Sequence, residues 1–211
     1  MHVLLASSTG RGRLPAARPG PRVSSDMDDE GPENDDAATF DRLRRRVLWS
    51  MPTGLYVIGS RAGEPPEAVE RNLMTANLVV QVAVDPKLVA VAIDRHAVTC
   101  RLVARGGRFS VGILARQDRT LVRRFIKPVP PADIVTDGHR VVSMVGEPVF
   151  EPPGGAPIPT RSVAWLDCRV RQQLDLGSHH LFVGEVVAAG GPDGPVPDVL
   201  RMEDTKMNYG G

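Results

Sequence analysis

Apolar positions repeat along this chain with two different periods. Between Thr39 and Met51, Phe40, Leu43 and Val47 recur at helical spacing, and Pro52 follows the end of the segment. This pattern predicts a short amphipathic helix that begins at Thr39. Elsewhere, short runs rich in Val, Ile and Leu are separated by turn residues, which is typical of strands. The predicted strands are 54–60, 78–84, 88–93, 108–114, 140–145, 162–174 and 180–189.

Turn and helix signals separate these strands. Glu64–Glu67 contains two prolines, and Asp85-Pro86 divides two valine-rich runs, so each predicts a turn. A short helix is expected over 98–104, ending at Gly106-Gly107, and another over 116–125 with Leu121, Val122 and Phe125 on one side. Six or more strands at hairpin-like spacing favour a mainly β fold, an antiparallel barrel with short helices, over alternating βαβ units.

Glycine and proline are unevenly distributed. They number 21 and 19 among 211 residues, and 28 of these 40 lie in 1–38, 126–161 and 190–211. Residues 1–38 also carry separate basic and acidic blocks with few apolar positions, which predicts a disordered extension. We therefore expect one domain over 39–211, with 126–161 as a long loop.

Charge and composition exclude several classes of protein. Lys+Arg 26 against Asp+Glu 25 gives a net charge of +1, and aromatic residues make up 4%, so neither a basic field nor a stacking platform for nucleic acid is expected. Apolar runs are too short to span a bilayer, so no membrane association is expected. Two cysteines without a convincing secretory signal favour a reducing, cytoplasmic location and no disulfide framework, and the spacing of histidines and cysteines predicts no metal site.

Three polar clusters are candidates for chemistry. Asn72–Asn77 could hold an anion through backbone N–H groups and Thr75, although a strand entry with a satisfied turn would look the same. Asp94–Arg101 begins a helix beside arginines, which suits a phosphate, although arginines on a solvated helix face have the same pattern. His179, after Gly177, could donate a hydrogen bond or titrate near neutral pH, although a satisfied loop histidine is more common.

Taken in order, these segments resemble the flavin reductase family, the FMN-binding split-barrel proteins. The resemblance runs from about Val47 to Met202. It rests on 52–58 (PTGLYVI), 74–77 (MTAN) with Asp85-Pro86, Arg95 with Thr99, 109–114 (FSVGIL), Gln117 with Phe125, and 177–186 (GSHHLFVGEV). The chain departs from the family pattern at Leu78, Gln81 and Ala83, where serines are common, at Gly112 in place of Asn, and at Ser178 in place of Asp.

The resemblance implies a site and a reaction. FMN or FAD would bind in a groove at a homodimer interface, and NADH or NADPH would pass hydride from nicotinamide C4 to flavin N5. Cofactor contacts are expected from Met74, Thr75, Ala76, Asn77, Gln81, Arg95, Thr99, Arg101 and Gly112, with His179 as the candidate catalytic residue at the nicotinamide. The loop 126–161 would lie beside this groove, where a long loop can serve as a lid over the nicotinamide.

Three functions remain open at this point. The first is an NAD(P)H:flavin oxidoreductase that supplies reduced flavin to a monooxygenase. The second is a flavoprotein that keeps its FMN and transfers electrons. The third is a non-catalytic cofactor-binding module.

Overall fold

The computed structural model describes residues 32–205 except Pro66. The predicted disorder of 1–31 therefore lies outside the described residues. Helix α1 (Pro32–Trp49) begins seven residues before the predicted start at Thr39, so residues 32–38 belong to a helix. The chain divides into a unit that ends at Leu43 and a second that begins at Arg44, and α1 runs through this boundary.

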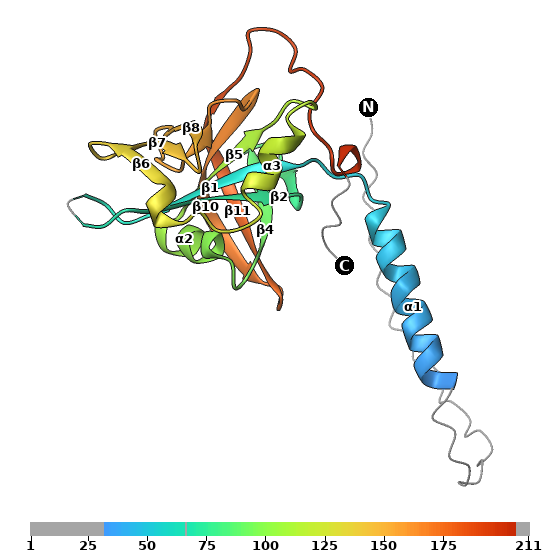
Figure 1. The fold of residues 1–211 in the computed structure, drawn as a ribbon. Coiled ribbons are helices and arrows are strands. Elements are labelled where there is room, and N and C mark those ends of the chain that lie inside the picture. The colour runs from blue at the N-terminus through green and yellow to red at the C-terminus, as the bar shows by residue number, and fades with distance from the viewer. Residues whose placement is uncertain (1–31, 66, 206–211) are drawn as a thin grey trace, which may run out of the picture. The chain divides into compact units, whose positions relative to one another are not determined.

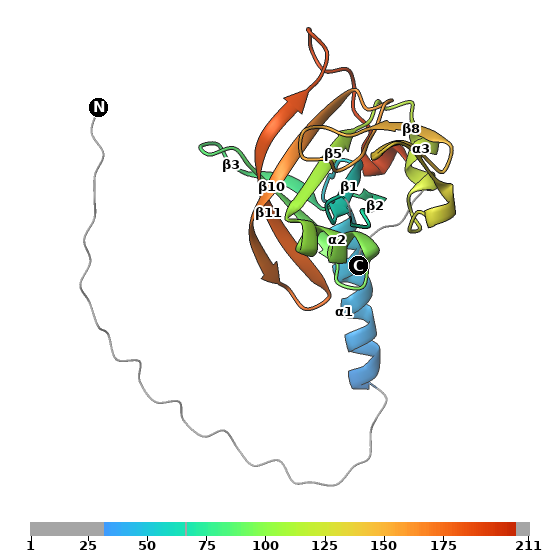
Figure 2. The same ribbon diagram turned by 90° about the vertical axis from the view of Figure 1, so that its left-hand side faces the viewer.

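The second unit is built on a seven-stranded antiparallel sheet (Figure 1). The strand order is β2-β1-β5-β10-β11-β4-β3. β10 and β11 are the longest strands and curve along the body, with β3 at the outer edge (Figure 2). The bounds are β1 Tyr56–Ala62, β2 Glu70–Ala76, β3 Val79–Ala83, β4 Leu88–Asp94, β5 Arg108–Ile113, β10 Ala164–Asp175 and β11 His179–Gly190. The predicted mainly antiparallel β fold is confirmed.

One strand of this sheet differs from the prediction. The segment Asn72–Asn77 was expected at the start of a strand that continues through 78–84. Instead β2 is a separate strand that pairs with β1, and β3 begins after a bend and pairs with β4. Polar residues in ERNLMTA hide this strand from a search for valine-rich runs.

The segment 126–161 is a second correction. It was predicted as a long loop with one possible strand, but it forms a four-stranded sheet in the order β6-β7-β8-β9. These strands are β6 Ile134–Asp137, β7 Arg140–Met144, β8 Glu147–Phe150 and β9 Ile158–Pro159, preceded by the 3-10 turn η1 Pro131–Asp133. Val141, Met144 and Val149 are buried in the core, so this segment is packed structure and not a loop; that it covers the nicotinamide stays a prediction.

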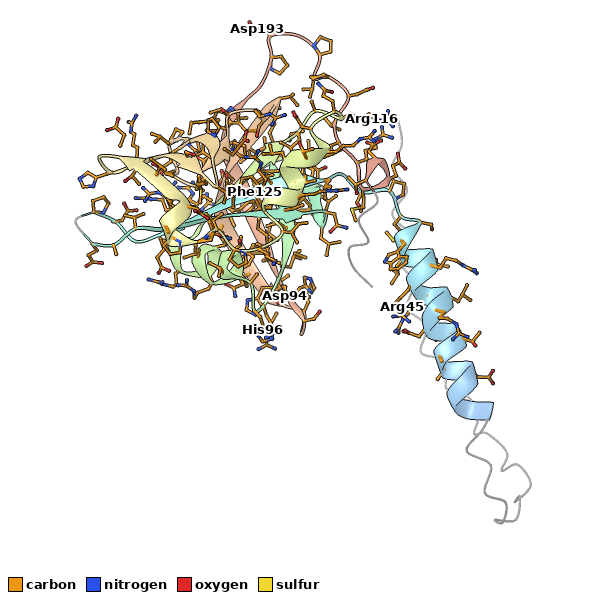
Figure 3. All side chains as sticks on the ribbon, viewed as in Figure 1. Arg45, Asp94, His96, Arg116, Phe125 and Asp193 are labelled. Atoms are coloured by element: carbon orange, nitrogen blue, oxygen red, sulfur yellow. The ribbon has the colours of Figure 1, made fainter. Side chains whose placement is uncertain are left out.

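Two hydrophobic clusters lie on opposite faces of the large sheet because side chains alternate along each strand. One face packs against α2 (Val98–Gly106), and we call it the α2 face; its cluster includes Ile58, Phe109 and Phe182. The other packs against α3 (Arg119–Arg124) and the small sheet, and we call it the small-sheet face; its cluster includes Val57 and Phe125. Phe125 lies near the centre of the body in Figure 3.

The end of α2 and the buried side of α3 are those that the sequence predicts. α2 stops at Gly107, whose left-handed backbone (φ 64°) lets its N–H bond to the Val103 carbonyl. Leu121, Val122 and Phe125 are fully buried at α3, as their spacing indicated. A second 3-10 turn, η2 (Met202–Asp204), follows the segment in which Leu200 bonds to Leu55 and Leu114.

Candidate functional site

Strand β2 points its predicted cofactor residues in two directions. Met74 packs on the α2 face, and Ala76 is buried in that same cluster. Thr75 pairs with Val57 and points to the small-sheet face, where its hydroxyl donates to the Val122 carbonyl. The side chains of Thr75 and Ala76 therefore pack within the protein. Met74 and Asn77 are partly exposed, Asn77 in the bend after β2.

The two threonines predicted to hold phosphate are both engaged inside the fold. Thr75 is 1% exposed and Thr99 is fully buried. Thr99 accepts a hydrogen bond of 2.8 Å from the Asn72 side-chain amide, whose oxygen in turn accepts from the Val129 N–H at 2.8 Å. This geometry does not offer either hydroxyl to a ligand, and Asn72 links Thr99 on α2 to the backbone of Val129.

Arg95 and His179 lie together where β4 meets the β10–β11 hairpin. His179 pairs with Asp94, and the Arg95 N–H donates to the Ser178 carbonyl at 3.0 Å. Nη1 of Arg95 donates to the Gly177 carbonyl at 3.2 Å, and Nδ1 of His179 lies 2.9 Å from the Ser178 hydroxyl. Asp94 and His96 lie at this end of the body in Figure 3. Arg95 and His179 are thus both held at the same surface corner.

Arg101 lies apart from that corner. Its guanidinium donates to both carboxylate oxygens of Glu70, at 3.1 and 2.7 Å, and Arg105 donates to the same carboxylate at 2.6 Å. These hydrogen bonds, of which those from Arg101 have the largest effect, lower the pKa of Glu70 to about 2. Arg101 also lines a pocket of about 390 Å³ between the start of β2, α2 and residues 128–134; it is the one member of the predicted set there.

Gly112 is covered by the chain itself. It pairs with Val57 and Trp165 in the middle of the sheet. A Cβ at this position would come within 2.7 Å of the Ser162 hydroxyl and 3.5 Å of Pro159. The space beside Gly112 is therefore filled by residues 159–162, and the predicted contact with a cofactor is not supported by this packing.

Gln81 lies on β3, the edge strand of the large sheet. Its side-chain amide donates to the Ala83 carbonyl at 3.1 Å. Leu78 just before the strand and Val80 and Val82 on it are 44%, 60% and 51% exposed. Together they form an exposed apolar surface next to the bend at Asn77, which can accept a flat ring or a second protein surface.

Other candidate chemistry is sparse in the described part of the chain. Among residues 32–205, no group of three or more His, Cys, Asp or Glu side chains could hold a metal ion. Both cysteines are free and buried, and burial raises the pKa of Cys168 to about 12. No helix within the described ranges is long and apolar enough to cross a membrane.

Comparison with known proteins now decides the family. A model of the flavin reductase like domain matches residues 48–209. The chain belongs to the flavin reductase-like family.

Individual relatives agree with this assignment. The NADH-dependent flavin reductase StyB of Pseudomonas fluorescens is 27% identical over 156 residues, 74% of this chain and 82% of that protein. An NADH-dependent FAD reductase of Streptomyces globisporus is 30% identical over 151 residues, 71% of this chain and 76% of that protein. The solved structure of BorF, the flavin reductase component of a bacterial two-component tryptophan halogenase, is 25% identical with a TM-score of 0.58 and covers 72% of this chain and 88% of its own.

The family is thus the one that the sequence resemblance indicated. Within the candidate site, the structure brings Arg95 and His179 together, places Asn77 and Gln81 beside the exposed apolar face of β3, and separates Arg101, Thr99 and Gly112 from them. Which of these residues touch a cofactor stays a prediction.

Proposed function

We propose that this protein is an NAD(P)H-dependent flavin reductase that transfers hydride from a nicotinamide to FMN or FAD. The match of the flavin reductase like domain over residues 48–209 carries this proposal. Both curated relatives described above are named as NADH-dependent reductases of a flavin. The bound flavin and nicotinamide supply the redox chemistry, and the protein supplies position and electrostatics.

The described residues fit a flavin in part. The exposed apolar face of β3 offers a surface for the ring, and backbone groups at Asn77 and Leu78 lie at its end. Arg95 supplies a positive charge for phosphate, and His179 beside it supplies a hydrogen-bonding group at the nicotinamide. The threonines and Gly112 do not fit this role, so phosphate binding would depend on Arg95 and backbone N–H groups.

The proposal includes a homodimer in the cytoplasm. Strand β3 pairs only with β4 among the described strands, so its outer edge leaves backbone N–H and C=O groups without a strand partner. The apolar side chains on this strand favour coverage by a second copy, which would also enclose the flavin groove. The two unpaired cysteines suit a reducing compartment.

We also propose that the reduced flavin passes to a separate monooxygenase. BorF, which is similar to this chain over 72% of its length, is named as the reductase component of a two-component system. A protein that releases its flavin would purify nearly colourless and turn over added flavin as a substrate.

Steady-state oxidation of NADH and NADPH, measured with riboflavin, FMN and FAD in turn, tests the proposal. We expect a rate that rises with flavin concentration and saturates. A yellow protein that retains FMN through dialysis and shows no dependence on added flavin would instead support the electron-transfer alternative. If the protein neither binds flavin nor oxidises nicotinamide, the non-catalytic cofactor-binding module is the alternative that remains.

A further inference from the structure

Four arginines occupy one row across four adjacent strands of the large sheet. Arg71 on β2 pairs with Arg61 on β1, and Arg108 on β5 pairs with Arg169 on β10. Ser60 pairs with Phe109, so Arg61 and Arg108 are the next residues along β1 and β5. Residues directly opposite each other in an antiparallel pair share a face, and like charges in that position destabilise the sheet. We call these four residues the arginine row.

The row lies on the small-sheet face. Arg71 donates to Glu151 next to β8 at 2.6 Å, and a Cβ on Gly155 would come within 3.0 Å of the Arg61 side chain. One row further along the strands, Ser110 and Asp167 are buried beneath 154–157, where they bond to Pro157 and Gly154. The arginine row therefore begins where this covering segment ends.

Three members of the row have a carboxylate partner, and one does not. Arg71 pairs with Glu151 and Arg61 with Glu64 at 2.9 Å. Arg169 pairs with Glu185 at 3.3 Å, but Arg171 binds that same carboxylate. The backbone of Arg108 pairs with Arg169 in the sheet, but its side chain makes no hydrogen bond or ion pair with any residue that the structure describes.

Charge accumulates at the β5–β10 end of the row. Arg108, Arg169 and Arg171 carry three positive charges there, and Arg169 and Arg171 share the carboxylate of Glu185. The side chains of Arg169 and Arg171 are each 50% exposed, so solvent reaches this end. Asp167 attracts Arg108, but that carboxyl is fully buried and burial raises its pKa, which weakens its value as a counter-charge.

We propose that Arg108 and Arg169 bind a phosphate-type oxyanion on this face. Guanidinium groups bind such anions through paired, charge-assisted hydrogen bonds, and the anion would remove the repulsion between the two facing arginines. None of the residues predicted to contact flavin or nicotinamide belongs to the row, so the inference stands apart from the proposed reductase activity. The anion could be free inorganic phosphate or pyrophosphate, or the diphosphate of a dinucleotide.

Titration of the full-length protein with inorganic pyrophosphate, followed by calorimetry and by thermal unfolding in a phosphate-free buffer, tests the site. We expect saturable binding that raises the melting temperature, and a loss of affinity of about tenfold or more in Arg108→Gln. Arg123→Gln on α3, which removes another exposed arginine, is the matched control and should bind as the parent does.

The stability of the same variant without ligand gives a second, independent reading. Because Arg108→Gln removes a like-charge contact, we expect its melting temperature without anion to equal or exceed that of the parent, while pyrophosphate no longer raises it. A parallel titration with ADP-ribose distinguishes a dinucleotide from a free anion as the ligand. If ADP-ribose binds more tightly than pyrophosphate and this binding is lost in Arg108→Gln, the ligand is a dinucleotide. Equal or weaker binding of ADP-ribose indicates a free anion. Absence of pyrophosphate binding in the parent, or equal binding in Arg108→Gln, would overturn the proposal.

Discussion

Asp167 on β10 is a fully buried carboxyl group with one hydrogen bond. Its Oδ2 accepts from the Gly154 N–H at 2.6 Å, and its Oδ1 has no partner among the described residues. Burial raises the pKa of this group above that of an unfolded chain. The protonated form is therefore favoured by folding, and the stability that it contributes is lost as pH rises from the unfolded pKa through the folded one.

Asp167→Asn separates the cost of the charge from the value of the hydrogen bond. The amide oxygen can still accept from Gly154 and no charge is buried, so we expect equal or greater stability than the parent at pH 7 and a smaller difference at pH 4. Asp167→Ala leaves the Gly154 N–H without a partner and should cost about 1–3 kcal/mol. Urea unfolding at both pH values measures these differences; an Asn variant as unstable as the Ala variant would contradict the argument.

His179 is the residue with the most direct predicted part in the reaction. If it contacts the nicotinamide, His179→Ala should lower kcat/KM for NAD(P)H about tenfold, which is ~1.4 kcal/mol of transition-state stabilisation, with flavin affinity little changed. His180→Ala is the matched control, because His180 bonds instead to Gln173 and contacts Phe182. An unchanged turnover rate in His179→Ala would remove this residue from the site.

At the scale of elements, patterns of apolar residues predicted most strands and both α2 and α3 correctly. They did so where burial on both faces leaves a continuous valine-rich run, as in 88–93, or where Gly107 must end a helix. They missed β2, because Glu70, Arg71 and Asn72 make side-chain bonds to neighbouring elements and so interrupt the apolar pattern. They also missed the small sheet, whose short strands are separated by the prolines and glycines that indicated a loop.

The candidate site shows the same limit. Family motifs located Thr75, Thr99 and Gly112, but only the pairing of strands decides which way a side chain points. A one-residue change of register reverses every side chain of a strand, and no sequence pattern in β2 or β5 distinguishes a ligand contact from a packing contact. Arg95 and His179 are 84 positions apart in the sequence. Only the order of the family motifs could predict that they lie in the same site.

Gly112 on β5 gives an element-scale prediction that distinguishes packing from cofactor binding. Because a Cβ would come within 2.7 Å of Ser162, Gly112→Ala should destabilise the fold by about 1–3 kcal/mol. Flavin affinity, measured by fluorescence quenching below the unfolding transition, should stay near that of the parent. Gly194→Ala, where a Cβ would meet no atom within 4 Å, is the control and should be neutral. A large loss of flavin affinity with no loss of stability would instead return Gly112 to the cofactor site.

At the scale of the whole molecule, the edge strand β3 links folding to assembly. Leu78, Val80 and Val82 expose apolar side chains on or next to this strand, and the strand has a free backbone edge in the described structure. Burial of this face against a second copy would remove both features from water, and each fully buried valine would contribute about 1.5–3 kcal/mol. The proposed dimer and the proposed flavin groove therefore depend on the same residues.

The double variant Val80→Lys with Val82→Lys tests this dependence. Two charges on the proposed interface should convert a dimer into a monomer by light scattering at micromolar concentration, and should weaken flavin binding at the same time. Val142→Lys on β7, a valine that is 41% exposed, is the matched control and should leave both unchanged. If the variant becomes monomeric but binds flavin as the parent does, the flavin groove lies within one chain. If the parent itself is a monomer, the proposed dimer is wrong, and flavin would be the molecule that covers the apolar side chains of β3.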